Sequence, residues 1–168
     1  MHASPHLHLL CGKIAAGKST LAAKLSIQPE TVMISEDAWL KSLFADEMTT
    51  GADYVRFSGR LKAAMEPHVL ALLAKGISVV LDFPANTRSQ RGWLKHLSDE
   101  TGVPHVLHYL DASDELCLQR LRARNAKGGH AFAVTDAQFW QFTKYFDPPS
   151  PEEGFNVVRH EQRPDAAE

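Results

Sequence analysis

The sequence has little of what small domains use in place of a large hydrophobic core. It contains two cysteines, Cys11 and Cys117, among 168 residues. Neither belongs to a C-x-x-C pair, and two cysteines are too few for a disulfide framework. Both lie among aliphatic residues, so we expect two buried thiols. The nine histidines are scattered along the chain, and we predict no zinc site. The absence of a G-x-S-x-G motif also argues against a serine hydrolase.

An excess of charge of one sign is also lacking. The formal net charge is -2 and the sequence pI is about 6.5. Proteins that bind nucleic acid usually carry a basic excess, so this balance argues against that role. No stretch is apolar enough to cross a membrane, and the N-terminus lacks the basic-then-apolar pattern of a secretory signal. We therefore expect a cytoplasmic protein that does not bind membranes, with one domain over residues 1–168.

Short apolar runs alternate with helical patterns along the chain. Continuous apolar runs are typical of strands that are buried on both faces of a parallel sheet. The predicted strands are 7–11, 31–35, 77–82, 105–110 and 155–159. The predicted helices are 18–25, 38–44, 58–75, 88–101, 114–126 and 135–145, the last with Thr135 as its N-cap. The alternation predicts an α/β three-layer domain with a parallel sheet of about five strands and helices on both faces. We expect loops at 46–53 and 126–134 and a frayed tail after about residue 160.

Residues 12–19 read GKIAAGKS and match G-x-x-x-x-G-K-[ST], the phosphate-binding loop (P-loop), at every fixed position. The small residues of such a loop let backbone N–H groups approach phosphate oxygens at a helix N-terminus. We expect Lys18 to bind the β- and γ-phosphates, the Ser19 hydroxyl to ligate Mg²⁺ and Thr20 to contact the α-phosphate. The residues assigned to the nucleotide are Gly12, Ala15, Ala16, Gly17, Lys18, Ser19 and Thr20.

Carboxylates follow three predicted strands, at the edge where open parallel sheets bind their ligands. They are Asp37, Asp82 and Asp111. We predict that Asp37 is the general base that accepts the proton of an attacking hydroxyl, with Glu36 as the second choice. The alternative is that Asp37 caps the helix that follows it. Asp82 ends a Val-Val-Leu-Asp run, the Walker B pattern, and we predict that it holds Mg²⁺ together with Ser19.

Two arginines near the end of the helix predicted at 114–126 indicate a lid. Arg120 and Arg124 are four residues apart and share one helix face. They precede a glycine-bearing segment, so we predict a lid around residues 120–134 whose arginines stabilise charge on the transferred phosphate. A solvated helix face is the alternative. Further candidates for holding the substrate, each with an equally plain surface role, are Arg56, Arg60, Asn86 and Arg88.

With these motifs, the chain resembles a group of P-loop kinases described as AAA-type ATP-binding. The group includes polynucleotide 5′-hydroxyl kinase domains, zeta-toxin-like kinases and chloramphenicol phosphotransferase. The resemblance runs from about residue 7 to residue 158. The residues that match the polynucleotide-kinase pattern are Asp37, Asp82, Asn86, Trp93, Arg124 and Asn125. The resemblance implies Mg·ATP, transfer of its γ-phosphate to a hydroxyl, Asp37 as base and Arg124 on the phosphates.

The sequence departs from polynucleotide kinases directly after Asp37. Those enzymes carry an arginine there that holds the substrate phosphate, whereas Ala38, Trp39 and Leu40 supply no charge. Together with the slightly acidic net charge, this favours a small-molecule acceptor. We therefore predict an ATP-dependent phosphotransferase acting on a hydroxyl of a small molecule. The alternatives are a polynucleotide 5′-hydroxyl kinase and an ATP-binding regulatory module with little transferase activity.

Overall fold

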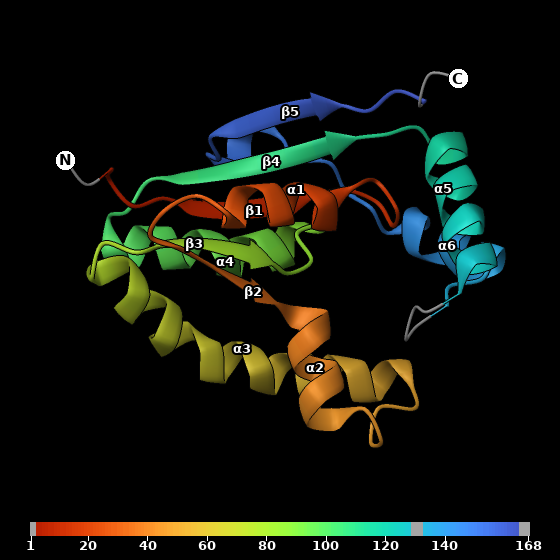
Figure 1. The fold of residues 1–168 in the computed structure, drawn as a ribbon, viewed down its shortest axis with the longest axis horizontal. Coiled ribbons are helices and arrows are strands. Elements are labelled where there is room, and N and C mark those ends of the chain that lie inside the picture. The colour runs from red at the N-terminus through yellow and green to blue at the C-terminus, as the bar shows by residue number, and fades with distance from the viewer. Residues whose placement is uncertain (1–2, 129–132, 165–168) are drawn as a thin grey trace.

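The fold is built on a parallel sheet, which a computed structural model describes over residues 3–128 and 133–164. The strand order is β2-β3-β1-β4-β5, which places β1 at the centre (Figure 1). The strands are β1 (Leu7–Cys11), β2 (Thr31–Ser35), β3 (Ser78–Asp82), β4 (His105–Asp111) and β5 (Val157–Glu161). The helices are α1 (Lys18–Ser26), α2 (Glu36–Phe44), α3 (Gly51–Ala74), α4 (Arg88–Thr101), α5 (Asp114–Lys127) and α6 (Asp136–Lys144). The predicted three-layer α/β class is confirmed.

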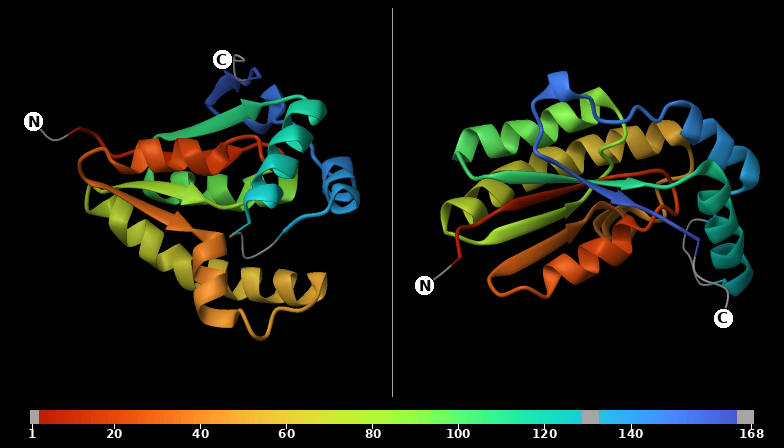
Figure 2. Two further views of the ribbon diagram at one scale, coloured as in Figure 1. Left: turned by 45° about the vertical axis from the view of Figure 1, so that its right-hand side comes forward. Right: turned by 90° about the horizontal axis from the view of Figure 1, so that it is seen from above.

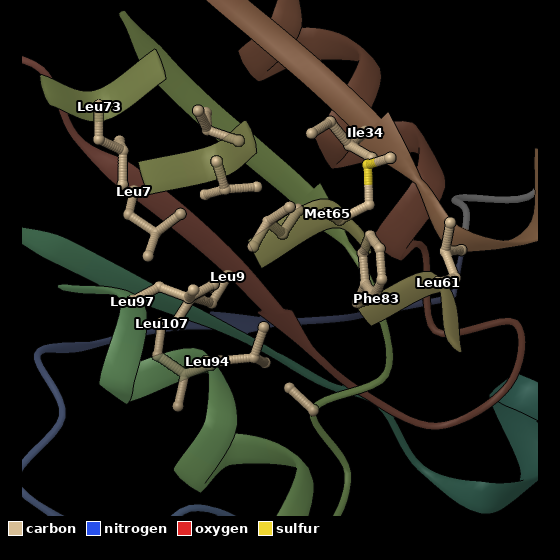
Figure 3. Packing of buried hydrophobic residues seen from close by; sticks show 14 of the residues in the cluster. Leu7, Leu9, Ile34, Leu61, Met65, Leu73, Phe83, Leu94, Leu97 and Leu107 are labelled. Atoms are coloured by element: carbon tan, nitrogen blue, oxygen red, sulfur yellow. The ribbon is translucent and has the colours of Figure 1, made fainter. Parts of the chain in front are cut away.

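Helices lie on both faces of this sheet, as Figure 2 shows. Helices α3 and α4 cover one face, and α1 packs on the other against β1, β2 and β3. Successive side chains of a strand point to opposite faces. In β1, Leu7 and Leu9 therefore meet the leucines of α3 and α4 (Figure 3), while Leu10 meets Ala22 of α1. Helices α5 and α6 lie at the end of the sheet toward which the strands run (Figure 1).

Two helices begin earlier than the sequence pattern predicts. Helix α3 starts at Gly51, where Thr50 and Asp53 form a reciprocal capping box. The expected loop at 46–53 therefore ends in helix, and the T-x-x-D signal was missed. Helix α2 starts at Glu36, and the hydroxyl of Ser35 accepts the capping bond from the Ala38 N–H (3.3 Å). The alternative reading of Asp37 as an N-cap is therefore wrong.

The C-terminal half follows the predicted order with one shift. Strand β5 lies two residues later than predicted, and Thr135 caps α6 as expected. Of the expected lid, residues 129–132 lie outside the described residues, as do residues 165–168 of the expected tail. Cys11 and Cys117 are both buried and free, which confirms their prediction as buried thiols. Within residues 3–128 and 133–164, no helix has the length and apolarity needed to cross a membrane.

A buried arginine ties the segment between α6 and β5 to the helical layer. The Arg91 side chain on α4 is fully buried, and it donates to both carboxylate oxygens of Glu153 (2.7 and 3.1 Å). It also donates to the backbone carbonyls of Ala85 (3.0 Å) and Asp147 (2.7 Å). Burial acts to raise the pKa of Glu153, but the bonds from Arg91 and the Ser150 N–H outweigh it and lower that pKa. The two bonds to Glu153 and the one to Asp147 thus hold a segment that otherwise has little regular structure.

Replacing this arginine is expected to destabilise the fold strongly. Arg91→Leu leaves Glu153 without its partner in a largely buried place, which costs about 3–5 kcal/mol in the free energy of unfolding. The matched control is Arg88→Leu, because Arg88 is exposed and pairs with Glu152 and Asp147 at the surface, where such pairs contribute about 0–1 kcal/mol. Urea unfolding of both variants measures the difference. Equal losses would contradict the anchoring role of Arg91.

Candidate functional site

The P-loop connects β1 to α1 and has the backbone that its sequence predicts. Gly17 takes a left-handed conformation (φ 105°), which favours glycine. At Gly12, a Cβ atom would lie 3.1 Å from the Leu110 carbonyl oxygen and 3.2 Å from the Cβ of Ala16. Glycine is therefore required at both positions. The backbone angle requires it at position 17, and close packing requires it at position 12. The structure thus agrees with an anion-binding loop at the N-terminus of α1.

Lys18 folds back over the loop. Its ammonium group donates to the backbone carbonyls of Gly12 (2.5 Å) and Lys13 (2.9 Å). Burial lowers the pKa of Lys18, while the carboxylates of Asp82 and Asp37 act in the opposite direction. The ammonium group is thus held inside the P-loop. A cation that binds phosphate oxygens has to lie there.

Ser19 and Asp82 lie together, as predicted for a metal site. The Ser19 hydroxyl donates to Asp82 Oδ2 at 3.4 Å. Burial raises the pKa of Asp82, Lys18 lowers it and Asp37 raises it further. Mg²⁺ prefers oxygen ligands and is usually held by one or two protein groups, with water and phosphate completing its shell. A hydroxyl and a carboxylate side by side at the loop fit that requirement.

Asp37 lies in the first turn of α2, directly beyond the carboxyl end of β2. It is exposed, and its charge acts on Lys18 and Asp82. Ser35 pairs in register with Asp82 across β2 and β3, so the two strands end side by side. The partial positive charge of a helix N-terminus favours a carboxylate at this place. Asp37 is therefore an accessible carboxylate whose charge acts on both Lys18 and Asp82.

Glu36 has a different environment from its neighbour. It is 1% exposed and accepts hydrogen bonds from the hydroxyl groups of Tyr54 (2.5 Å) and Ser58 (3.3 Å). Burial raises the pKa of Glu36, which these two bonds partly offset. The carboxylate thus joins the first turn of α2 to α3 and is closed off from solvent. The sequence did not indicate Tyr54, because the early start of α3 was missed, and Ser58 stood only at the predicted start of that helix.

The two predicted lid arginines lie on α5, and Arg120 contacts the P-loop. Arg120 Nη1 donates to the Ala16 carbonyl (3.4 Å) and to Gln162 Oε1 (3.4 Å), and Nη2 donates to the Arg163 carbonyl (3.5 Å). Arg124 has a buried Nε atom with no hydrogen-bond partner among the described residues. A buried donor without a partner costs free energy. A bound anion within reach of Arg124 would supply the missing acceptor.

The remaining candidates are spread over other parts of the structure. Asn86 lies at the loop, and its Oδ1 accepts a bond from the Gly12 N–H (3.0 Å). Arg88 instead donates to Ser150 Oγ (2.9 Å) and Glu152. Arg56 and Arg60 lie over the Phe57 ring on α3, 4.5 and 5.6 Å from its centroid. Three further predicted residues are placed as follows: Asp111 pairs with Arg159, Trp93 donates to Glu66 (2.8 Å), and Thr20 lies in the first turn of α1.

This fold and loop are shared with known proteins. Adenylyl-sulfate kinase of Myxococcus xanthus (strain DK1622) is 30% identical over 156 residues, which cover 90% of this chain and 79% of that protein. The structure of Chaetomium thermophilum Kti12 in complex with ADP-AlF3 is similar, with a TM-score of 0.72 at 16% identity over 95% of this chain and 91% of that one. A gluconokinase from Sinorhizobium meliloti 1021 has a TM-score of 0.59 at 15% identity, covering 95% and 83% of the two chains.

The family model described as AAA domain matches residues 7–149, which include the P-loop, Asp37, Asp82 and the arginines of α5. The two solved structures are too distant in sequence to indicate more than the fold. The family model and the bacterial relative, in contrast, both span most of the chain. The chain therefore belongs to the AAA-domain family of P-loop kinase-like proteins.

Proposed function

We propose that this protein transfers the γ-phosphate of Mg·ATP to a hydroxyl group of a small molecule. The observation that carries the proposal is the position of Asp37. Its carboxylate is exposed at the end of β2 and acts electrostatically on both Lys18 and Asp82. A loop that only binds nucleotide needs no accessible carboxylate there. Phosphoryl transfer to a hydroxyl needs a group that orients the nucleophile and accepts its proton.

Each group has a defined task in this reaction. The acceptor O–H bond breaks and its proton passes to Asp37, while the acceptor oxygen bonds to the γ-phosphorus and the bond to the β-phosphate oxygen breaks, releasing ADP. Lys18 and the N–H groups of the P-loop hold the phosphates in line. Ser19 and Asp82 would hold Mg²⁺, which, when bound, neutralises charge on the phosphate oxygens. Arg120 and Arg124 reach the same phosphates from α5, where their charge stabilises the equatorial oxygens.

The surroundings of Asp37 favour a small acceptor over a nucleic acid. The residues directly after it on α2 are Ala38, Trp39 and Leu40, so the three positions that follow the proposed base offer no cation for a substrate phosphate. Trp39 is 41% exposed and provides an apolar surface beside the proposed base. The similar protein from Myxococcus xanthus is named as a kinase of adenylyl sulfate, a small molecule. A polynucleotide 5′-hydroxyl kinase and a regulatory ATP-binding module are the alternatives.

Removing the proposed base is expected to abolish transfer and spare nucleotide binding. Asp37→Asn keeps the shape of the side chain but cannot accept a proton, so the transfer rate should fall by about 100-fold or more. The Kd for ATP should stay within about threefold, less than 1 kcal/mol. The matched control is Asp136→Asn, the same change in the first turn of α6, which should leave both quantities unchanged. Transfer at the wild-type rate by Asp37→Asn would exclude Asp37 as the base.

A γ-phosphate transfer screen over sugars, nucleosides, nucleotides, antibiotics and 5′-hydroxyl oligonucleotides distinguishes the acceptor classes. We expect transfer to a member of the small-molecule set, and little oligonucleotide binding at any salt concentration. A protein that grips several phosphates loses about 10³–10⁵ in affinity between 50 and 200 mM salt. Phosphorylated oligonucleotide with such a salt dependence would establish the polynucleotide alternative. Tight ATP binding without transfer to any acceptor would establish the regulatory one.

A further inference from the structure

Three histidines form a continuous chain across the sheet, apart from the site described above. His8 on β1, His108 on β4 and His160 on β5 come from three neighbouring strands. His8 Nδ1 lies 3.0 Å from His108 Nε2, and His108 Nδ1 lies 2.9 Å from His160 Nε2. Both ring nitrogens of the central histidine are therefore engaged, one with each neighbour. The residues are 100 and 52 positions apart in sequence, so only the order of the strands brings them together.

The hydrogen-bond chemistry of imidazole limits how many protons this chain can hold. A neutral ring has one N–H donor and one acceptor nitrogen, and a protonated ring has two donors. Three neutral rings satisfy both bonds when all donate in the same direction. One added proton is also tolerated, for example on His108, which then donates to both neighbours. Any two added protons leave at least one pair of nitrogens facing each other as donors, so the chain breaks.

Within residues 3–128 and 133–164, no carboxylate acts on the charge of His8 or His108. His6 stacks on His8 with ring centroids 6.1 Å apart, so it adds a further titratable ring. Helix α1 packs on this face of the sheet with Leu21, Ala22 and Leu25. On β5, Arg159 and Glu161 alternate with His160 and so point to the opposite face. There Arg159 pairs with Asp111, and Glu161 pairs with Arg163 at 3.8 Å.

The direction of the titration follows from burial and from these neighbours. His108 is 7% exposed; burial, then the charges of His8 and His160, lower its pKa from 6.5 to about 4. Burial and the charge of His6 also lower the pKa of His8. The folded chain therefore binds fewer protons than the unfolded chain below the ordinary histidine pKa of about 6.5. The stability that the neutral chain contributes is complete above pH 6.5 and is lost as the pH falls toward 4.

The end of β5 connects this chain to the P-loop. The side-chain amide of Gln162 donates to the carbonyl of His160 (3.3 Å). The backbone N–H of Gln162 donates to the Asp111 carbonyl (2.9 Å). Its Oε1 accepts from Arg120 Nη1, which also donates to Ala16 in the loop. The same oxygen would lie 3.5 Å from a Cβ atom built on Gly17. The Gln162 side chain thus hydrogen-bonds both to the backbone of His160, the last residue of the histidine chain, and to Arg120 beside the P-loop.

We propose that Gln162 is a positioning residue for Arg120, and that the chain of His8, His108 and His160 is a latch that holds Gln162 in place until protonation opens it. Opening releases His160 from His108 and with it the end of β5. Arg120 then loses an acceptor that orients it toward the loop, and nucleotide is bound less tightly. The coupling to nucleotide rests on the proposed function, whereas the latch itself does not.

The first experiment tests the latch without nucleotide. Amide hydrogen exchange of residues 157–162 is measured at pH 7.5 and 4.0 and corrected for the intrinsic pH dependence of exchange. We expect protection to fall at pH 4.0 in the wild type and to be low at both pH values in His108→Phe, which keeps a ring of similar volume but cannot form the link to His160. His160→Gln serves as a second variant, and His68→Phe, an exposed histidine on α3, as the matched control that behaves like the wild type. Equal protection at both pH values in the wild type would overturn the latch.

The second experiment tests the coupling. The Kd for ADP is measured by calorimetry at both pH values, and the ratio of the two is compared between wild type and His108→Phe, so that protonation of the nucleotide cancels. We expect the wild-type ratio to be at least about fivefold larger. Gln162→Ala should weaken binding at pH 7.5 and remove the excess pH dependence, whereas Gln28→Ala on an exposed loop should do neither.

The two experiments can contradict the latch and its coupling to nucleotide independently of each other. Equal ratios in wild type and His108→Phe, with a latch that does open in the exchange experiment, would overturn the role of Gln162. Absence of ADP binding at pH 7.5 would overturn the coupling together with the proposed function, while the exchange experiment would still decide on the latch.

Discussion

The partly buried ammonium group of Lys18 is the interaction on which the site depends. A cation removed from water needs compensating partners. Here these are the carbonyls of Gly12 and Lys13 and the carboxylates of Asp37 and Asp82. They come from the ends of three adjacent strands. A sheet in which these strands ran in different directions would scatter them. The parallel order with β1 at its centre therefore decides that the P-loop, Asp82 and the candidate base Asp37 share one edge.

The C-terminal segment completes the surroundings of that edge. Arg91 holds the turn at Glu153, and the Asn86 carbonyl accepts a bond from the Asp147 N–H (2.8 Å). From this anchored turn the chain enters β5, whose end carries Gln162 to Arg120. The loop thus has two supports of different kinds. Asn86 fixes its first residue by a direct hydrogen bond, while β5 acts on it through an arginine of α5.

Membership of the AAA-domain family and the geometry of the site limit the chemistry more than they limit the substrate. In the proposed reaction, the P-loop, Ser19 and Asp82 act on the nucleotide. The acceptor side is formed by less regular features: the apolar start of α2, and an α3 whose N-terminal half is joined to α2 through Glu36 and Tyr54. Buried carboxylates that link two helices orient them with respect to each other. The acceptor is therefore to be sought among molecules that fit beside Asp37 and Trp39.

The sequence alone determined the strands, their parallel arrangement, the P-loop and the grouping of Asp37 and Asp82. These follow from continuous apolar runs and from a motif with short spacing, and both are local properties. The starts of α2 and α3 could also have been read locally, from Ser35 and from the T-x-x-D capping box. The tertiary structure alone decided that Arg91 is buried and that Glu36 is closed off beside an exposed Asp37. It also brought together three histidines from distant parts of the chain. Such contacts depend on strand order and helix packing, which bring together residues whose spacing in sequence carries no periodic signal.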